Sequence, residues 1–488
     1  MLEKLARQTA VYGISTIVGR FLSYLLTPYY TRVFGQDTYG IITDVYSLIP
    51  FALVLLTMGM ESSYFRFSAR ADAAGGDAQA AKRRLFATTW GITSLAAVLF
   101  FMLVAVDCRP IAAVMGKAYV AHPEYVLLVG AIVMFDVMGC IPFSRLREQG
   151  RAARFVALKL FNVVLNVTLA FGFGIAGLYG SEFGVGWVLV ANLAASVATW
   201  AAILFTVGGV LPRIDFRLLS QILTYSLPLL VSGSAAMASE FIDRQMIKYL
   251  TPVDAMAQVG VYGAITKIAV VMTLFTQMYR LAAEPFFLAN YKKEQFVEMN
   301  AAALKYFMLV SVGIFLGISL FRDVFALIVG ADFREGIYIL PIVLVTNVLA
   351  GVWLNLSFWY KREEKTRFAV YVTFAGLGCT VLVGLVLIPL LGYYGAAWMR
   401  LASEAVMVVV SYVLNRRYFP TPYDLPRIGE YVAVGGGVFV ASELFARAVP
   451  DSLAQFGVNA VLFAAFALYA VRRERIDVKG LVRAVLRR

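Results

Sequence analysis

The chain has 488 residues, of which 61% are hydrophobic and 15% are charged, and its mean hydropathy is +0.77. A soluble protein of this length needs many more polar residues to cover its surface, so the composition excludes a water-soluble globular protein and indicates a membrane protein. The net charge of +13 comes from basic residues scattered over short loops, which argues against a nucleic-acid partner and fits attraction to anionic lipid headgroups.

Apolar runs of about 20 residues, each long enough to cross a hydrocarbon core about 30 Å thick, recur from one end of the chain to the other. They predict an all-α polytopic membrane protein of about fourteen transmembrane helices, because each run is too long and too uniformly apolar for a barrel strand. In chain order the predicted spans cover residues 9–34, 38–60, 85–106, 123–143, 155–175, 183–207, 219–239, 257–281, 303–321, 336–358, 368–390, 395–414, 428–445 and 453–471.

The basic residues assign a side of the membrane to each loop. With both termini inside, about 29 Lys and Arg residues fall in inner segments and about 8 in outer segments. One span more or fewer would invert half of the loops and destroy this agreement. The sequence therefore predicts an even number of spans with the N- and C-termini in the cytoplasm.

Short fragments recur at a similar spacing. Tyr39-Gly40-Ile41-Ile42-Thr43 returns as Tyr262-Gly263-Ala264-Ile265-Thr266, at an offset of 223, and two further matches have offsets of 213 and 211. Six spans per repeat is an even number, so the repeats are predicted to run parallel. They define an N-lobe at 1–210 and a C-lobe at 211–420, while 421–488 adds spans thirteen and fourteen and a basic tail. Two such lobes around a central cavity suit an alternating-access transporter.

Charged residues inside spans are costly, at about 2.5–3.5 kcal/mol each at the bilayer centre, and are candidate functional groups. Arg20 lies about 17 Å from either end of the first span, too far to reach water easily, so it should face a hydrated cavity or a buried acid. Lys267 follows the second repeat fragment directly, as Asp44 follows the first, and these two could pair or bind substrate and a coupling ion. Lys159 lies about five residues inside span five, where its side chain could equally extend to the surface.

The candidate substrate-binding residues are thus Arg20, Lys267, Lys159 and Arg244, and the candidate ion-coupling residues are Asp44, Asp136 and Asp243. For Asp136 the nearby Arg145 offers a purely structural partner. Deep cations favour a phosphate-bearing substrate over an organic cation. Cys108, Cys140 and Cys379 do not cluster and His122 is the only histidine, so we expect no metal or other cofactor.

The stretches TRVFGQDTYGIITDVYSLIPFALVLLTMGMESSYFRF, LTYSLPLLVSGSAAMASEFIDRQMIKYL, VGVYGAITKIA and LGYYGAAW resemble the polysaccharide (O-antigen type) flippases of the multidrug/oligosaccharidyl-lipid/polysaccharide exporter superfamily. The resemblance covers nearly the whole chain. It implies a MATE-like fold whose cationic cavity accepts an undecaprenyl-diphosphate-linked oligosaccharide, with Arg20 matching a mid-span Arg of the family. It also implies a multi-pass protein of the cell inner membrane that acts in lipopolysaccharide or other surface polysaccharide biosynthesis. The partners it implies are membrane lipids and a polysaccharide polymerase or other assembly proteins.

Two other functions stay open at the level of sequence. A drug/cation antiporter of the same fold predicts acids deep in the N-lobe, with which Asp44 is compatible and Arg20 is not. A membrane-embedded polysaccharide polymerase, ligase or glycosyltransferase needs a large outer loop or soluble domain with carboxylates or His, and the predicted outer loops are too short for one. The sequence therefore favours a transporter over an enzyme.

Overall fold

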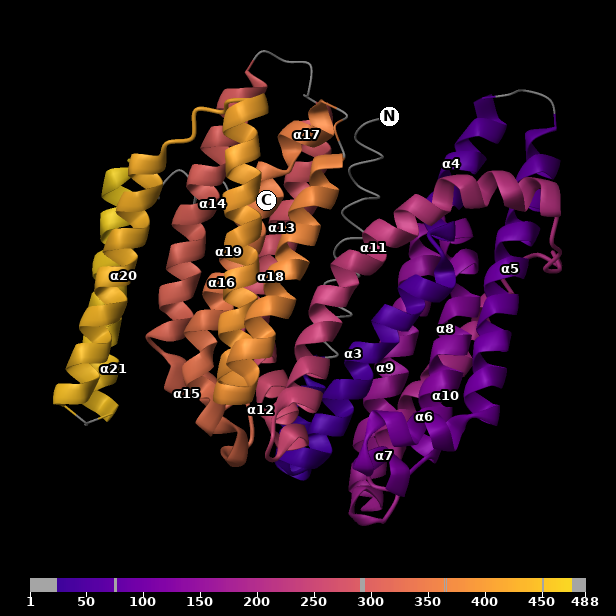
Figure 1. Ribbon diagram of the computed structural model, residues 1–488, viewed down its shortest axis with the longest axis horizontal. Helices are drawn as coiled ribbons and strands as arrows, with labels where there is room; N and C mark the ends of the chain where they lie inside the picture. Colours follow the sequence, from indigo (N-terminus) through magenta and orange to yellow (C-terminus); the bar gives the residue numbers. More distant parts are fainter. Residues whose placement is uncertain are drawn as a thin grey trace. The chain divides into compact units, whose positions relative to one another are not determined.

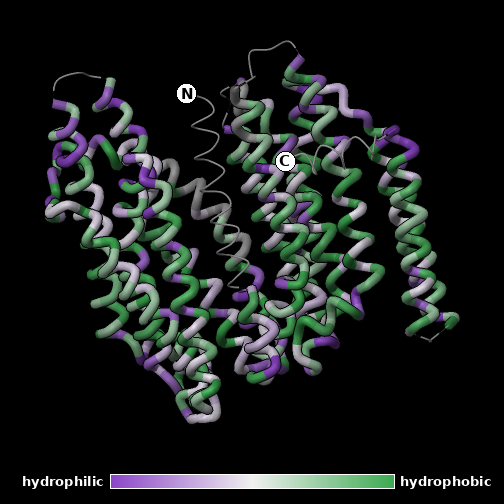
Figure 2. Tube along the Cα trace, turned by 180° about the vertical axis from the view of Figure 1, so that it is seen from behind, coloured by the Kyte–Doolittle hydropathy of each residue, from purple (hydrophilic) through white to green (hydrophobic). Residues whose placement is uncertain are grey.

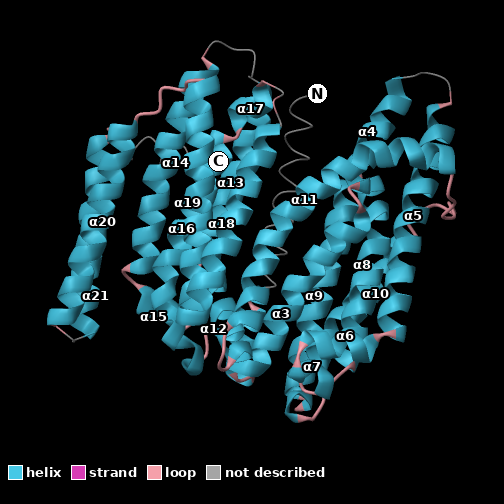
Figure 3. Cartoon of the chain, viewed as in Figure 1, coloured by secondary structure: helices cyan, strands magenta, loops and turns pink. Residues whose placement is uncertain are grey.

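The computed structural model describes residues 24–73, 77–289, 295–363, 365, 367–449 and 452–475. All regular secondary structure in these ranges is helical, as Figure 3 shows, which confirms the all-α prediction. Along the helices hydrophobic residues predominate, and hydrophilic residues gather toward the helix ends (Figure 2), as expected for membrane-spanning segments.

By compactness the chain divides into two units, residues 1–263 and 264–488, and the division falls within α12 (Ala255–Ile268). This differs from the repeat boundary predicted at residues 210–211, which is defined by the offset of similar fragments rather than by compactness. The helices of each unit can be followed by colour along the chain in Figure 1.

The N-terminal unit holds the first described helices. They are α2 (Leu26–Val33), α3 (Gln36–Thr57), α4 (Met60–Ala73), α5 (Ala78–Val106), α6 (Cys108–Met115), α7 (Lys117–Ala121), α8 (Glu124–Glu148), α9 (Ala152–Ile175), the 3-10 turn η1 (Leu178–Gly180), α10 (Gly186–Leu204), α11 (Phe216–Leu250) and the first part of α12.

The C-terminal unit begins within α12. It contains α13 (Val270–Ala289), α14 (Phe296–Ser319), α15 (Arg322–Ala326), the 3-10 helix η2 (Ala331–Ile339), α16 (Leu340–Leu356), α17 (Phe358–Arg362), α18 (Arg367–Leu391), α19 (Tyr393–Tyr418), α20 (Leu425–Ala448) and α21 (Ser452–Arg473).

Eleven helical segments of the described chain are long and apolar enough to cross a membrane, and the bent pair α12–α13 makes a twelfth if it counts as one span. These twelve match the predicted spans two to six and eight to fourteen. Most of the first predicted span lies outside the described residues, and the seventh coincides with α11, which is helical over 35 residues but is not among the eleven. The multi-span prediction is confirmed, while the number fourteen stays a prediction.

Two predicted spans are interrupted. The second ends in the backbone break at Met58 and Gly59, both in the left-handed region with φ of 50° and 68°, after which α4 continues the chain. The eighth bends by 54° between α12 and α13. The first break falls at the end of the predicted span, where charged residues begin in α4. The second does not follow from hydropathy, because the segments on both of its sides are apolar.

The core of the N-terminal unit is formed where α8 packs between α5 and α10, with α9 against α10 and α3 against α8. Near the predicted inner ends, Met60, Tyr64, Phe86 and Trp90 form one buried cluster, in which the Trp90 indole donates a hydrogen bond of 3.0 Å to the Met138 carbonyl. This packing fixes the positions of α4, α5 and α8, which carry part of the site described below.

In the C-terminal unit, α20 and α21 pack against each other and against α14. Ion pairs join the elements at both ends of this contact. Lys305 Nζ lies 2.6 Å from Glu474 Oε2, and Arg322 lies 2.5 Å from Glu443. The last two predicted spans are therefore attached to their own unit by charged as well as apolar contacts.

Candidate functional site

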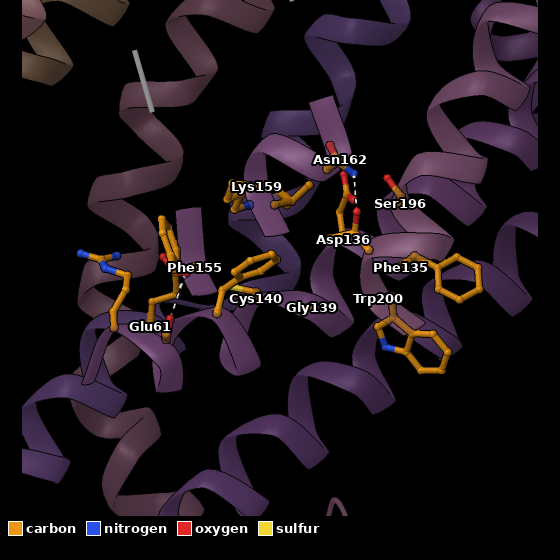
Figure 4. Close-up of a pocket in the computed structure, with 15 residues that line it drawn as sticks. Glu61, Phe135, Asp136, Gly139, Cys140, Phe155, Lys159, Asn162, Ser196 and Trp200 are labelled. Atoms are coloured by element: carbon orange, nitrogen blue, oxygen red, sulfur yellow. Dashed lines mark hydrogen bonds between the residues drawn. The ribbon is translucent and has the colours of Figure 1, made fainter. Parts of the chain in front are cut away.

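A cavity of about 230 Å³ lies inside the N-terminal unit, between α3, α4, α8, α9 and α10. We call it the polar cavity, because its lining includes two acids, two bases and several hydrogen-bonding side chains. The polar and charged side chains that define its chemistry include Glu61, Asp136, Arg147, Lys159, Asn162 and Ser196. Figure 4 shows most of these side chains gathered around one space.

The backbone break after α3 brings Glu61 to the polar cavity. Because Met58 and Gly59 adopt left-handed conformations, the chain changes direction before α4 begins at Met60. Glu61 lies in the first turn of α4, where a carboxylate is favoured by the helix dipole. The Ser144 hydroxyl of α8 donates a hydrogen bond of 3.1 Å to Glu61 Oε1.

Two helices contribute polar faces. Lys159 and Asn162 are three residues apart on α9, and Ser196 and Thr199 are three apart on α10, so each pair shares one side of its helix. The Asn162 amide donates a hydrogen bond of 3.1 Å to the Thr199 hydroxyl and joins the two helices. Side chains placed in this way keep polar groups satisfied inside an otherwise apolar bundle.

Asp136 of α8 lies beside Ser196, which is within hydrogen-bonding reach, and within electrostatic reach of Lys159. The Lys159 ammonium is also 4.2 Å from the centroid of the Phe143 ring, a cation–π contact at the edge of the cavity. Arg145 is not the partner of Asp136 that the sequence suggested. Its guanidinium donates to the Val207 carbonyl at 2.8 Å and lies over the Phe86 ring.

Further hydrogen-bonding side chains extend from the cavity between α3, α9 and α10. The Asn192 amide, one helical turn before Ser196 on α10, donates a hydrogen bond of 3.0 Å to the Tyr46 hydroxyl of α3. Tyr46 also has Asn166 of α9 and Asp136 as polar neighbours. Hydrogen-bonding groups from α3, α8, α9 and α10 therefore form one connected region within the membrane-spanning helices.

The composition of the polar cavity limits its chemistry. Equal numbers of acidic and basic side chains suit an exchangeable proton, a monovalent cation or an anionic group better than a multivalent metal ion. Among the described residues no group of three or more His, Cys, Asp or Glu side chains could hold a metal ion.

Asp44 lies in a second charged group, at the end of the N-terminal unit that the basic residues predict to be outside. Its Oδ2 accepts hydrogen bonds of 2.6 Å from Lys248 and 2.7 Å from the Tyr119 hydroxyl, and its Oδ1 accepts one of 2.6 Å from the Gln245 amide. We call these four residues the Asp44 cluster. The Lys248 and Asp44 side chains are only 6% and 2% exposed.

The other predicted site residues lie elsewhere. Asp243 is buried near the end of α11 and accepts a hydrogen bond of 3.3 Å from the Tyr262 hydroxyl, and its neighbour Arg244 is half-buried. Lys267 is a half-buried residue in the last turn of α12. None of these three lines the polar cavity. Arg20 lies outside the described residues.

The sequence interpretation thus named Asp136 and Lys159 of the polar cavity but missed its other members. Polar residues at one-face spacing within apolar spans, such as Asn162 with Lys159, were a usable signal. No comparable signal marked Glu61, because its position depends on the backbone break before α4. Lys248 follows the seventh predicted span on the predicted outer side, so its place in the sequence indicates only a loop cation.

The family of polysaccharide biosynthesis proteins matches residues 5–290, more than half of the chain. The comparison with curated protein sequences gave no match. Among solved structures, the lipid II flippase MurJ in an inward closed conformation is similar, with a TM-score of 0.74, 11% identity, and coverage of 96% of this chain and 100% of that chain. An inward-facing multidrug resistance MATE family transporter of the MOP superfamily has a TM-score of 0.69, 17% identity, and coverage of 85% and 95%. At these identities the similarity establishes a MATE-like fold.

Proposed function

Because this chain belongs to the polysaccharide biosynthesis protein family, we propose that it is a flippase that moves an anionic, lipid-linked oligosaccharide from the inner to the outer leaflet of a membrane. The family match over residues 5–290 is the observation that carries the proposal, since it covers all of the predicted spans one to eight. The MATE-like fold supports it, because that fold is shared by a solved flippase and by solved transporters.

The polar cavity supports a transport role rather than a purely structural one. Four ionisable side chains inside a membrane-spanning unit are expensive to maintain, and such groups usually mark an ion or substrate pathway. Of these four, Asp136 has both a hydroxyl and an ammonium close by. We assign Asp136 the coupling role, in which it takes up and releases a proton or a monovalent cation.

Lys159 is the cavity residue best suited to an anionic headgroup. It is exposed, its flexible stem allows the ammonium to move, and its present contact is an aromatic ring rather than a tight ion pair. A diphosphate bound there would compete with Asp136 for the same cation. This competition would couple headgroup binding to the charge state of Asp136. Arg20 remains a proposed second cation for the diphosphate, on the strength of its depth in the first span and its match to the family.

The proposal is tested by deleting the gene and analysing lipid-linked saccharides. A flippase defect leaves the complete lipid-linked oligosaccharide in the inner leaflet, so the extracted intermediate should accumulate while surface polysaccharide is lost. A plasmid copy should reverse both effects. If the deletion strain makes normal surface polysaccharide, or accumulates only an incomplete oligosaccharide, the flippase assignment is wrong.

A drug/cation antiporter is the second candidate, favoured by the two acids, Glu61 and Asp136, in the polar cavity. The cavity also contains Arg147 and Lys159, which would repel an organic cation. Measuring the susceptibility of the deletion strain to cationic dyes separates the two functions. An antiporter gene should change dye resistance and leave the lipid-linked intermediate at its normal level.

A further inference from the structure

The Asp44 cluster joins three elements that are far apart in the sequence. Asp44 is on α3, Tyr119 on the short outer helix α7, and Gln245 and Lys248 are near the end of α11. Three donors converge on the two oxygens of one carboxylate at 2.6–2.7 Å. Charge-assisted bonds of this length are among the strongest that side chains form.

Further contacts hold the same region together. The Tyr249 hydroxyl donates a hydrogen bond of 2.9 Å to the Val114 carbonyl of α6, and the Lys248 ammonium lies 4.8 Å from the Tyr119 ring centroid. One helical turn before Asp44, a Cβ placed on Gly40 would lie 2.0 Å from the Met256 carbonyl oxygen of α12. The backbones of α3 and α12 therefore touch next to the cluster.

A permanent tie between these helices would be better made with apolar side chains. Replacing a buried ion pair by well-packed hydrophobic residues is often neutral or stabilising, so a buried pair is weak evidence for stability alone. An ion pair has a different advantage. When its helices separate, water can solvate both charges, whereas separated apolar faces would be exposed to water at a cost. The pair is therefore suited to a contact that forms and breaks repeatedly.

The position of the cluster also suits such a contact. Asp44 belongs to the first predicted repeat and Lys248 to the first helix of the second, and all four residues lie at the predicted outer end. Alternating access requires the two repeats of a transporter to separate at one side of the membrane and then at the other. A buried charge pair that joins the two predicted repeats at one membrane side is placed where that movement would separate its partners.

We propose that the Asp44 cluster is a latch that fastens the outer ends of α3, α7 and α11 and opens once in each transport cycle. The place of the latch in a transport cycle rests on the proposed flippase function. The role of the cluster in holding the helices closed concerns the N-terminal unit alone. The latch closes the predicted outer end when Asp44 and Lys248 are paired.

Reversible cross-linking distinguishes a latch from a static ion pair. Cysteines replace Asp44 and Lys248 in a D44C/K248C variant, and a short bifunctional methanethiosulfonate joins them in cells that depend on this copy of the gene. Pulse labelling measures the export of newly made polysaccharide. This export should fall to background after cross-linking and return after reduction. Unchanged export in the cross-linked protein would overturn the proposal, because a static contact tolerates a permanent bond.

A matched control uses another ion pair of the same unit. Lys82 of α5 and Glu148 of α8 are also joined at 2.7 Å, but both helices belong to the first predicted repeat. The K82C/E148C protein should export equally well before and after cross-linking. The parent protein with its three native cysteines, treated with the same reagent, reports any effect of the reagent alone.

Hydrogen–deuterium exchange supplies a readout that needs no transport. In purified D44N protein, amide exchange at the outer ends of α3 and α11 should rise by about a hundredfold or more, since removing one partner of a buried ion pair shifts the equilibrium by this order. The charge-exchanged D44K/K248D protein should recover part of the protection. Unchanged exchange in D44N would refute the closing role. If the gene deletion leaves polysaccharide export normal, the flippase proposal fails, while this measurement still decides whether the cluster holds the helices closed.

Discussion

Replacing Gly40 by Ala tests the close approach of α3 and α12. The added Cβ would lie 2.0 Å from the Met256 carbonyl oxygen and 2.8 Å from its carbon. Carbon–oxygen contacts below about 3.3 Å are unfavourable, so the two helices must move apart by roughly 1.3 Å. Both atoms belong to the backbone and cannot rotate away. An overpacked site of this kind costs about 1–3 kcal/mol, against about 1 kcal/mol gained from the helix propensity of Ala over Gly.

Because the obstacle is rigid, we take the upper end of that range and expect a net loss of about 2 kcal/mol. For a unit of this size the loss corresponds to a fall of about 4 °C in the thermal midpoint. Intrinsic fluorescence of the detergent-solubilised protein measures it. The same separation would stretch the hydrogen bonds of the Asp44 cluster, which lies one turn further along α3, so exchange there should rise as well.

Gly172→Ala is the matched control. Gly172 is also within a membrane-spanning helix, α9, and no heavy atom would lie within 4 Å of its Cβ. This variant gains helix propensity without a collision and should be as stable as the parent or slightly more so. Equal midpoints for Gly40→Ala and Gly172→Ala would show that the two helices are not in backbone contact.

Four further outcomes are expected. Asp136→Asn should abolish polysaccharide export, measured by pulse labelling, while immunoblotting finds an unchanged amount of protein in the membrane. Normal export in this variant would rule out the coupling role of Asp136. Arg20→Ala should abolish export and Arg20→Lys should restore only part of it, if a diphosphate is held by a bidentate guanidinium; equal activity of Arg20→Lys and the parent would indicate a simple charge effect. Lys305→Met removes the closer of the two cations that pair with Glu474, the other being Arg427, and should lower stability by about 1–3 kcal/mol in thermal unfolding but not change export. The hydrogen bond from the Leu218 amide, aided by Arg84 and the Arg217 amide, lowers the pKa of Asp215 at the start of α11. The stability that the ionised Asp215 adds to this helix end is therefore complete above a pH of about 4 and is lost as the pH falls through the lowered pKa. Amide exchange in the first turn of α11 should thus rise only under strongly acidic conditions.

Hydropathy and charge determined the class of this protein without any structure. A segment of about 20 apolar residues can be stable in a bilayer only as a helix, because every backbone group must be paired within the segment. The predicted spans therefore correspond to helices wherever the chain is described, apart from the breaks at Gly59 and between α12 and α13. Asp136 and Lys159 could be named for the same reason, since a charge in an apolar run is visible along the chain itself.

Which side chains meet was decided only by the tertiary structure. Lys248 and Asp44 are 204 positions apart, and next to their pair the absence of a side chain at Gly40 lets α3 touch the backbone of α12, the helix that follows α11. Glu61 reaches the polar cavity because the chain turns at Met58 and Gly59, a feature of backbone angles rather than of hydropathy. A sequence reports the cost of placing a charge in the membrane, but the partner that offsets this cost is selected by how the helices pack.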